Sequence, residues 1–372
     1  MTPRRNSRNV AGVHLHDLLD SGFARPDTPL RTSVIESVVP TTSIAMSFPH
    51  SPKRRRLIQA ALLCASLPIA GCSSQPALGG TFLQLWRSHL DWSHEQWRSR
   101  LAATRDFGCQ EIFVQWVGID GEPGNTWRAP DTLIQFLLDQ CQRLGIGVHL
   151  GLPYDERWWQ AIGSQDGKTL DDFLQRTHAR GSAYMRDAGW PRHPAFRGWY
   201  VPYELEQYNW AAPARLDRLA GWLAGISEVA VATSGRPPAI STYFSQLPTP
   251  GTLTGMWGAL LDRVKLYPMI QDGVGVAGMR NYASLEPLHD LFIARQVKFD
   301  LILELFEQLP GEKADGSDFR ARSASFERIE AQWKIARDYG SQRLVAFALD
   351  PWVLGDSPEA AMLRREWASR IG

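Results

Sequence analysis

The feature that most constrains this chain is an alternation of short β-rich runs with longer helical stretches, repeated eight times after residue 79. We expect strands at residues 81–86, 111–116, 146–151, 198–204, 239–244, 264–270, 299–304 and 343–349. We expect helices at residues 93–107, 131–144, 169–188, 214–231, 254–261, 284–297, 319–339 and 357–371. Strands that alternate with helices in this way form βαβ units, whose strands lie parallel in one sheet.

Eight such units indicate a closed barrel. The last expected strand includes Leu-Val-Ala-Phe-Ala-Leu at residues 344–349, an apolar run typical of a parallel strand buried on both faces. The chain is 44% hydrophobic, enough for one large core. The sequence therefore predicts an α/β fold, a (β/α)8 TIM barrel, as a single domain over residues 77–372. A doubly wound open sheet is the alternative α/β arrangement.

Residues 1–76 precede this pattern, and part of them has the composition of an export leader. Residues 53–56 are Lys-Arg-Arg-Arg, and an apolar stretch at 57–70 follows them. This order is that of a secretory signal, and the stretch is shorter than the ~18 apolar residues of a membrane span. Residues 69–72, Ile-Ala-Gly-Cys, resemble the bacterial lipobox, which implies cleavage before Cys72 and acylation of its thiol. We expect an exported lipoprotein, periplasmic or at the outer membrane, attached to the membrane through Cys72.

Two details of the leader stay open. The arginines at 54–56 are similar to a twin-arginine signal, and an ordinary secretory signal is the alternative. Because an export signal normally begins its chain, Met46 is the expected start of translation. Neither detail changes the expected fold, because both fall outside the barrel.

The chain has four cysteines, of which two fall in the expected barrel. Cys64 lies in the leader and Cys72 is the expected lipid anchor, which leaves Cys109 and Cys141. These two could pair in an oxidising periplasm, but each lies at the edge of an apolar stretch, so we expect two separate buried thiols. No Cys/His spacing matches a zinc site, and the sequence indicates neither a metal nor a cofactor.

The charge is distributed unevenly along the chain. Of the 40 basic and 39 acidic residues, nine basic and four acidic ones lie within residues 1–72. The remaining 31 basic and 35 acidic residues give the barrel a net formal charge of about −4. A mildly acidic body is a poor binder of nucleic acid, so we expect no nucleic-acid partner.

Polar residues stand where the expected strands end, which is where a parallel barrel carries its functional groups. Amides, acids and tyrosines dominate these positions: Gln84, Gln115, Tyr154, Asp155, Glu204, Glu206, Tyr243, Gln271, Asp272, Glu304, Glu307 and Asp350. Several of the 15 tryptophans flank them: Trp86, Trp116, Trp158, Trp159, Trp199, Trp210 and Trp352. Sugar rings stack on aromatic faces and hydrogen-bond to amides and carboxylates, so the pattern favours a saccharide ligand. The alternative is that half or more of these indoles fill the core.

We expect substrate contacts from eleven of these residues: Gln84, Trp86, Gln115, Trp116, Tyr154, Tyr203, Glu206, Tyr243, Gln271, Asp272 and Trp352.

Two glutamates give the sharpest chemical prediction. Glu204 ends the fourth expected strand and Glu304 the seventh, so the two can face each other across the barrel mouth. Hydrolysis of a glycosidic bond needs one protonated carboxyl group and one ionised one. The apolar run before Glu204 should raise its pKa and make it the proton donor, which leaves Glu304 as nucleophile of a retaining mechanism. Asp272 is an alternative base, and a salt bridge to an arginine is the structural alternative for either glutamate.

These segments carry a resemblance to a known family. Residues 198–206 and 299–307, with 80–84 and 271–275, resemble a bacterial TIM-barrel family catalogued as domain of unknown function 4434 and regarded as glycoside-hydrolase-like. The resemblance implies a secreted, sugar-cleaving type of barrel, with Glu204 and Glu304 at the family's acidic positions. The placement is also similar to that in a large clan of retaining glycosidases whose acid/base follows an asparagine. Here Tyr203 takes that place.

A glycine-rich motif after the sixth expected strand is similar to a dinucleotide-binding motif. Residues 273–278 match G-x-G-x-x-G, but this stretch is the sixth unit of the barrel and the expected helix starts well after the last glycine. We therefore interpret it as a tight loop that points Asp272 into the mouth. The sequence favours a glycoside hydrolase acting on a polysaccharide, such as a bacterial exopolysaccharide. A non-catalytic carbohydrate-binding or polysaccharide-assembly lipoprotein is the alternative.

Overall fold

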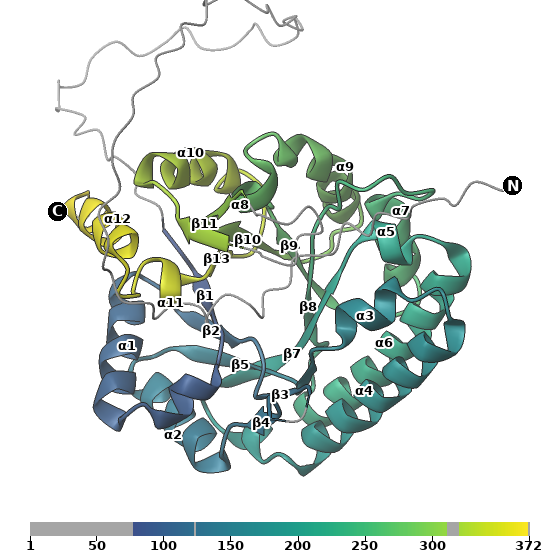
Figure 1. Ribbon diagram of the computed structural model, residues 1–372, viewed down its shortest axis with the longest axis horizontal. Coiled ribbons are helices and arrows are strands. Elements are labelled where there is room, and N and C mark those ends of the chain that lie inside the picture. The colour runs from purple at the N-terminus through teal and green to yellow at the C-terminus, as the bar shows by residue number, and fades with distance from the viewer. Residues whose placement is uncertain (1–76, 123, 311–319, 371–372) are drawn as a thin grey trace, which may run out of the picture. The chain divides into compact units, whose positions relative to one another are not determined.

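In the computed structural model, which describes residues 77–122, 124–310 and 320–370, eight parallel strands close into a barrel (Figure 1). In chain order they are β1 (Gly80–Leu83), β2 (Glu111–Val114), β5 (Gly147–Gly151), β7 (Phe196–Leu205), β8 (Ala239–Thr242), β9 (Tyr267–Gln271), β10 (Asp300–Glu304) and β13 (Leu344–Phe347). The barrel closes because β1 pairs with β13, with Gly80 opposite Val345. The predicted TIM barrel is confirmed, and its closure excludes an open doubly wound sheet.

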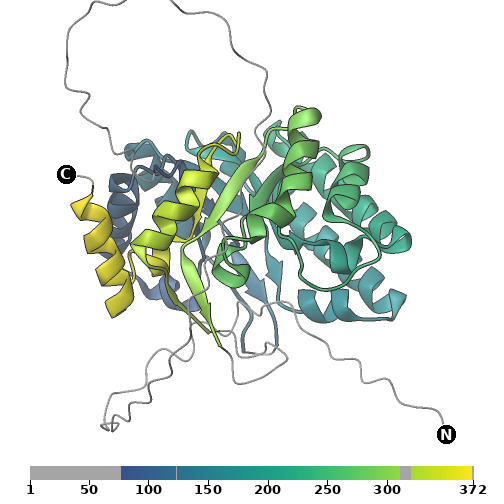
Figure 2. The same ribbon diagram turned by 90° about the horizontal axis from the view of Figure 1, so that it is seen from above.

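A longer helix follows each barrel strand and packs outside the barrel (Figures 1 and 2). These are α1 (His94–Asp106), α2 (Asp131–Arg143), α4 (Gly167–Asp187), α6 (Pro213–Ser234), α7 (Leu253–Leu261), α9 (Asn281–Ala294), α10 (Phe326–Ala336) and α12 (Pro358–Ser369). Shorter helices lie in the loops: η2 (Arg87–Asp91), α3 (Trp158–Gly163), η3 (Trp190–Arg192), α5 (Gln207–Trp210), α8 (Val274–Ala277) and α11 (Leu349–Trp352).

Two small sheets extend the loops after the barrel strands. One pairs β3 (Gly118–Asp120) with β4 (Trp127–Arg128) and with β6 (Tyr154–Asp155). The other pairs β11 (Phe306–Leu309) with β12 (Arg320–Ser323). The helix expected at 319–339 is therefore shorter: α10 starts after Ser325, whose side chain caps it by accepting from the Arg328 amide. Residues 320–323 form β12 because each pairs with a residue of β11.

Side chains alternate between the inside and the outside of the barrel along each strand. One buried cluster occupies the inside: Phe82, Phe113, Tyr200, Met269, Ile302 and Phe347. Gln84, Gln115, Gln271 and Glu304 each lie two residues beyond a member of this cluster, so they face inward at the carboxyl end of the barrel. Glu204 also faces inward, because its neighbours on both sides pack in the outer layer.

An ionic network closes the opposite end of the barrel. Arg343 donates to Asp300 at 2.7 Å and also pairs with Glu111. Glu111 lies 2.6 Å from His149 Nε2, and the Tyr267 hydroxyl donates to Asp300 at 2.8 Å. Asp300 is fully buried, so these partners supply its hydrogen bonds and its countercharge. Packing of this kind at the amino end of a barrel serves stability, and the reactive groups lie at the other end.

Several sequence predictions outside the mouth can now be placed. Cys109 and Cys141 are buried free thiols, as expected. Trp158, Trp199 and Trp210 are at most 1% exposed and fill the layer between barrel and helices. The expected export signal at 53–72, with the acylation site Cys72, lies outside the described residues. Within the part of the chain that is described, no helix is long and apolar enough to cross a bilayer.

Candidate active site

Glu204 lies one residue before the end of β7 and projects into the barrel mouth. Its Oε1 accepts a hydrogen bond of 2.8 Å from Nε2 of Gln271 at the end of β9. Burial raises the pKa of Glu204, and this hydrogen bond works in the opposite direction because it favours the carboxylate. Glu204 is half-buried, so it keeps access to a ligand in the mouth.

Glu304 is the last residue of β10 and is 4% exposed. Its Oε2 accepts a hydrogen bond of 2.8 Å from the backbone N–H of Gly275. Burial, together with the negative charges of Asp272 and Glu204, raises the pKa of Glu304 to about 8. The charge of Glu204 therefore acts on Glu304, as expected for two carboxyl groups that share one mouth.

The glycine-rich loop at 273–278 holds the carboxyl group of Glu304. A Cβ atom on Gly275 would lie 2.9 Å from Glu304 Oε2 and 2.6 Å from the carbonyl oxygen of Phe306. Only a residue without a side chain lets its N–H approach the carboxyl group in this way. In a dinucleotide-binding motif such a loop N–H binds a phosphate, whereas here it binds the carboxyl group of Glu304.

Asp272 lies beneath Glu304 and away from the mouth. Its side chain is fully buried, and it accepts hydrogen bonds from four donors: the Val274 amide, the Glu304 amide, the Tyr282 hydroxyl and the Gln332 side chain. Burial raises its pKa to about 6. The loop thus turns Asp272 away from the mouth and toward α9 and α10, where it holds the backbone of Glu304, instead of pointing it at a substrate as the sequence predicted.

Two residues of α10 complete this support and were missed by the sequence analysis. Arg328 Nη2 donates to the backbone oxygen of Glu304 at 2.6 Å, and Gln332 Nε2 donates to the Asp272 carboxylate. Gln332 is fully buried on the helix face that otherwise carries Ile329 and Trp333. A glutamine on an apolar helix face was the signal that could have found it.

Glu206 and Tyr203 do not reach the mouth. Glu206 is 1% exposed and caps α5, where its carboxylate accepts from the amides of Tyr208 and Asn209. Tyr203 faces the helix layer, and its hydroxyl accepts from the backbone N–H of Asp155 at 3.0 Å. Both predicted substrate contacts are therefore parts of the scaffold: strand alternation turns Tyr203 outward, and the chain turns into α5 directly after β7 at Glu206.

Aromatic residues line the side of the mouth opposite the acids. Trp86 and Trp116 meet edge to face with ring centroids 5.2 Å apart, and Trp116 stacks on Tyr154 at 5.3 Å. Trp86 and Tyr154 are half-buried, so part of each ring stays open to a ligand. Tyr243 and Trp352 are also half-buried, and Trp352 packs on Phe306 at 5.6 Å.

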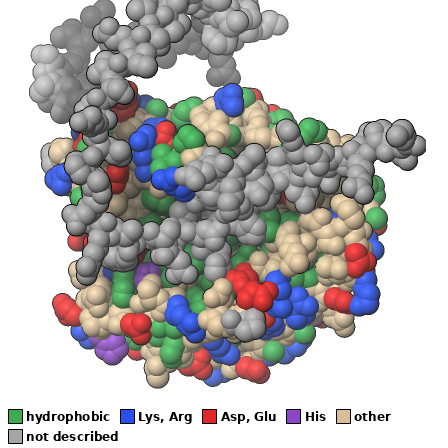
Figure 3. Space-filling model, in the orientation of Figure 1, with side chains coloured by type: hydrophobic (Ala, Val, Ile, Leu, Met, Phe, Trp, Pro, Cys, Tyr) green, Lys and Arg blue, Asp and Glu red, His purple; other side chains and the backbone are tan. Residues whose placement is uncertain are grey.

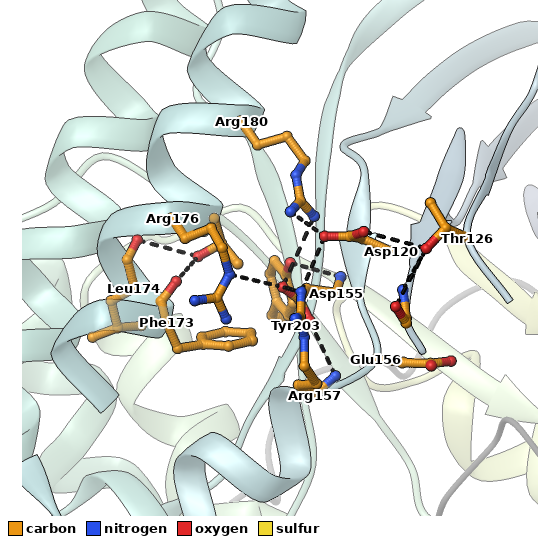
Figure 4. Close-up of polar contacts among 12 residues, drawn as sticks. Asp120, Thr126, Asp155, Glu156, Arg157, Phe173, Leu174, Arg176, Arg180 and Tyr203 are labelled. Atoms are coloured by element: carbon orange, nitrogen blue, oxygen red, sulfur yellow. Dashed lines mark hydrogen bonds and ion pairs between the residues drawn. The ribbon is translucent and has the colours of Figure 1, made fainter. Parts of the chain in front are cut away.

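An arginine–aspartate cluster fixes this aromatic side to the scaffold (Figure 4). Asp155 follows Tyr154 in β6 and is fully buried, and its carboxylate accepts from Arg157 at 2.7 Å and from Arg176 at 3.3 Å. Arg180 of α4 pairs with Asp120 of β3. The cluster ties the small sheet to α4 and so holds Tyr154 in place. On the face in Figure 3, the described acidic and basic side chains are interspersed, in agreement with the weak charge of the barrel.

Within the described residues, no cluster of three His, Cys, Asp or Glu side chains could hold a metal ion. The chemistry that the mouth can perform with its own side chains is proton transfer and nucleophilic attack by carboxyl groups.

Comparison with known proteins gives the family. The family described as "Domain of unknown function (DUF4434)" matches residues 78–362, so the chain belongs to it. The uncharacterized protein YbcH of Escherichia coli (strain K12) is 26% identical over 188 residues, which span 49% of this chain and 60% of that protein.

A solved structure with the same fold is a candidate α-L-fucosidase from Bacteroides thetaiotaomicron VPI-5482. It superposes with a TM-score of 0.54 over 83% of this chain and 99% of that chain, at 14% identity. A β-galactosidase from Marinomonas ef1 gives a TM-score of 0.49 over 78% of this chain and 59% of that chain, at 10% identity. The first similarity shows that the fold is one that glycosidase-like TIM barrels use.

Proposed function

We propose that this member of the DUF4434 family is a glycoside hydrolase in which Glu204 and Glu304 are the reacting carboxyl groups. The observation that carries the proposal is that two strand-ending glutamates, from β7 and β10, face one barrel mouth, where Gln271 of β9, the strand beside β10, donates to Glu204. The similar fold of the candidate α-L-fucosidase supports the proposal at the level of architecture.

The environment of each group favours one protonation state. Four N–H and O–H donors point at the carboxylate of Asp272, which favours its ionised form, and its pKa of about 6 leaves it charged at neutral pH. Glu304, buried beside this charge, has a pKa of about 8 and holds a proton at neutral pH. Burial raises the pKa of Glu204 as well, but Glu204 is half-buried and its hydrogen bond from Gln271 favours the carboxylate, so we take it as the ionised partner.

We therefore assign Glu304 as proton donor and Glu204 as nucleophile, the reverse of the assignment that the sequence suggested. In the first step the Glu204 carboxylate attacks the anomeric carbon as the glycosidic C–O bond breaks, and Glu304 gives its proton to the leaving oxygen. In the second step water attacks the anomeric carbon, the bond from that carbon to the Glu204 oxygen breaks, and the Glu304 carboxylate takes a proton from that water. The sugar leaves with its anomeric configuration retained.

The test is release of reducing ends from a panel of purified bacterial polysaccharides. We expect release by the wild type and a loss of about 1,000-fold or more in Glu204→Gln and in Glu304→Gln. Glu307→Gln is the matched control, because Glu307 is exposed and pairs with Arg322 at 2.9 Å. Glycan binding by the wild type without any release would instead favour the non-catalytic carbohydrate-binding protein.

We also propose that the protein is exported and acylated on Cys72. This proposal rests on the residue pattern at 53–72 alone. Cells grown with labelled palmitate should give a labelled membrane protein, and Cys72→Ala should carry no label. A processed wild-type protein without label would show a plain secreted enzyme.

A further inference from the structure

Two glutamine side chains stand side by side in the barrel mouth. Gln84 directly follows β1 and Gln115 directly follows β2, and the residues before them, Leu83 and Val114, are register partners. The Gln115 amide N–H donates to the Leu83 carbonyl at 2.9 Å, so the pairing continues to this level. Both glutamines lie two residues beyond members of the inner cluster, Phe82 and Phe113, and face inward.

These two amides lack the partners that burial demands. Gln84 is 6% exposed and Gln115 is 4% exposed. Nε2 of Gln84 and Oε1 of Gln115 have no hydrogen-bond partner among the described residues, and they do not bond to each other. An unpaired buried amide atom costs roughly 1–3 kcal/mol, so a ligand that hydrogen-bonds to both atoms would recover that cost.

What the pair offers is one free donor and one free acceptor at adjacent positions. A sugar hydroxyl both donates and accepts, so two hydroxyls of one ring can complete both amides. The half-buried rings of Trp86 and Tyr154 lie on the loops that follow β1 and β5, and the buried Trp116 packs against both. Together they provide a stacking surface for the C–H face of a ring and polar atoms for its edge.

The cations that act on groups of the mouth already face acids: Arg100 pairs with Asp350 at 2.8 Å, and the Arg328 charge acts on Asp272 and Glu304. Burial raises the pKa of Tyr154, and Tyr203, Glu204, Asp155 and Glu156 raise it further. Burial and the Arg100 charge lower the pKa of His89, which accepts from the Trp86 amide, to about 4, so this imidazole is neutral at physiological pH. A carboxylate or sulfate on the ring would be repelled by the charge of Glu204, which acts on Tyr154.

We propose that Gln84 and Gln115 form a binding subsite for an uncharged sugar ring, one that selects neutral glycans over uronic-acid or sulfated ones. This inference rests on the proposed function, because it takes the barrel mouth to be a saccharide site, and it names the substrate class.

The melting temperature of the ligand-free protein tests, without any catalysis, whether the two amides serve binding or structure. Methionine has nearly the length of glutamine and no strong hydrogen-bonding group, so Gln84→Met and Gln115→Met remove an unpaired amide with little change in volume. If the amides await a ligand, these variants melt at the same temperature as the parent or above it. If the amides are structural, the same variants melt lower.

The experiment measures binding by titration calorimetry in a Glu304→Gln parent, which keeps the mouth charge of the proposed resting state and stops turnover. The probes are hexasaccharides of β-1,4-glucan, β-1,4-mannan and β-1,4-xylan, against hexamers of galacturonate and alginate. We expect an uncharged hexamer to bind best, and each Gln→Met substitution to weaken it by at least about tenfold. Gln135→Met, an exposed glutamine of α2, is the matched control and should change neither binding nor melting.

Three results would overturn the inference: tighter binding of the acidic hexamers, binding unchanged in both Gln→Met variants, or no binding of any hexamer. If Gln84→Met and Gln115→Met, made in the wild-type enzyme, turn over substrate with unchanged KM, the subsite proposal is refuted and the hydrolase proposal stands. If the hexamers bind, lose affinity in the Gln→Met variants and are never cleaved by the wild type, the subsite proposal stands and the hydrolase proposal is refuted.

Discussion

Substitution of Gly275 tests how the loop at 273–278 positions Glu304. An alanine Cβ at this position would lie 2.6 Å from the Phe306 carbonyl oxygen and 2.9 Å from Glu304 Oε2, whereas 3.4 Å is the lower limit of ordinary contact. The loop must therefore move away from Phe306 by about 0.8 Å, and its distance from the Glu304 carboxyl group must grow by about 0.5 Å. Either movement lengthens the 2.8 Å hydrogen bond from the Gly275 N–H to Glu304.

We expect Gly275→Ala to fold and to lose most of its activity. A misplacement of about 1 Å in a reacting group can reduce the rate by about 100-fold, and overpacking of this kind destabilises a protein by roughly 1–3 kcal/mol. The rate is measured as kcat/KM on a glycan that the wild type cleaves, and stability by urea denaturation. The rate loss should therefore exceed what unfolding alone explains.

Gly221→Ala is the matched control. Gly221 lies inside α6 with no atom near its missing Cβ, so the same substitution should raise stability by up to ~1 kcal/mol and leave the rate unchanged. The reasoning is refuted if Gly275→Ala keeps the kcat/KM of the wild type, or if both alanine variants lose activity equally.

Three further predictions concern charge. Asp272→Asn removes the buried anion beside Glu304 and lowers the pKa of Glu304 from about 8, so the alkaline limb of the pH–rate profile should shift to lower pH; an unshifted limb contradicts the assignment. Because burial raises the folded-state pKa of Glu304, the free energy of unfolding of the wild type should fall as pH rises from about 4.5 to about 8. In Glu304→Gln it should fall less, and equal pH slopes in denaturant titrations of the two proteins would contradict this. Arg343→Met leaves Asp300 and Glu111 without their cation, so the free energy of unfolding measured in urea should fall by about 3 kcal/mol. The kcat of the folded fraction should be unchanged, and a loss of kcat would place this network in the active site.

The barrel could be predicted because its signal is repeated. Eight strand–helix units, each with its own apolar run, favour a closed barrel over an open sheet. The ends of the strands then locate the mouth. Strand alternation also predicts that Glu204 and Glu304 face inward, since each ends a run whose alternate residues are buried inside the barrel.

What the sequence could not predict depends on how single loops turn. Asp272 follows β9 by one residue, but the left-handed Gly273 after it, at φ 62°, folds the loop back and buries the carboxylate. Glu206 stands two residues after Glu204, yet it caps α5 because the chain turns into a helix there. Residues 320–323 have no strong strand pattern, and they form β12 only because β11 lies beside them. In each case the outcome depends on neighbours distant in sequence or on one backbone angle.

The most direct test of the central claim is to trap the covalent intermediate. The wild type is incubated with the 2-deoxy-2-fluoro glycosyl fluoride of a sugar that it cleaves, and the labelled peptide is identified by mass spectrometry. The account predicts one fluoroglycosyl ester, on Glu204, and no label in Glu204→Gln. A label on Glu304 would reverse the two roles, and a label on any other residue, or turnover with inversion and without an adduct, would contradict the proposed mechanism.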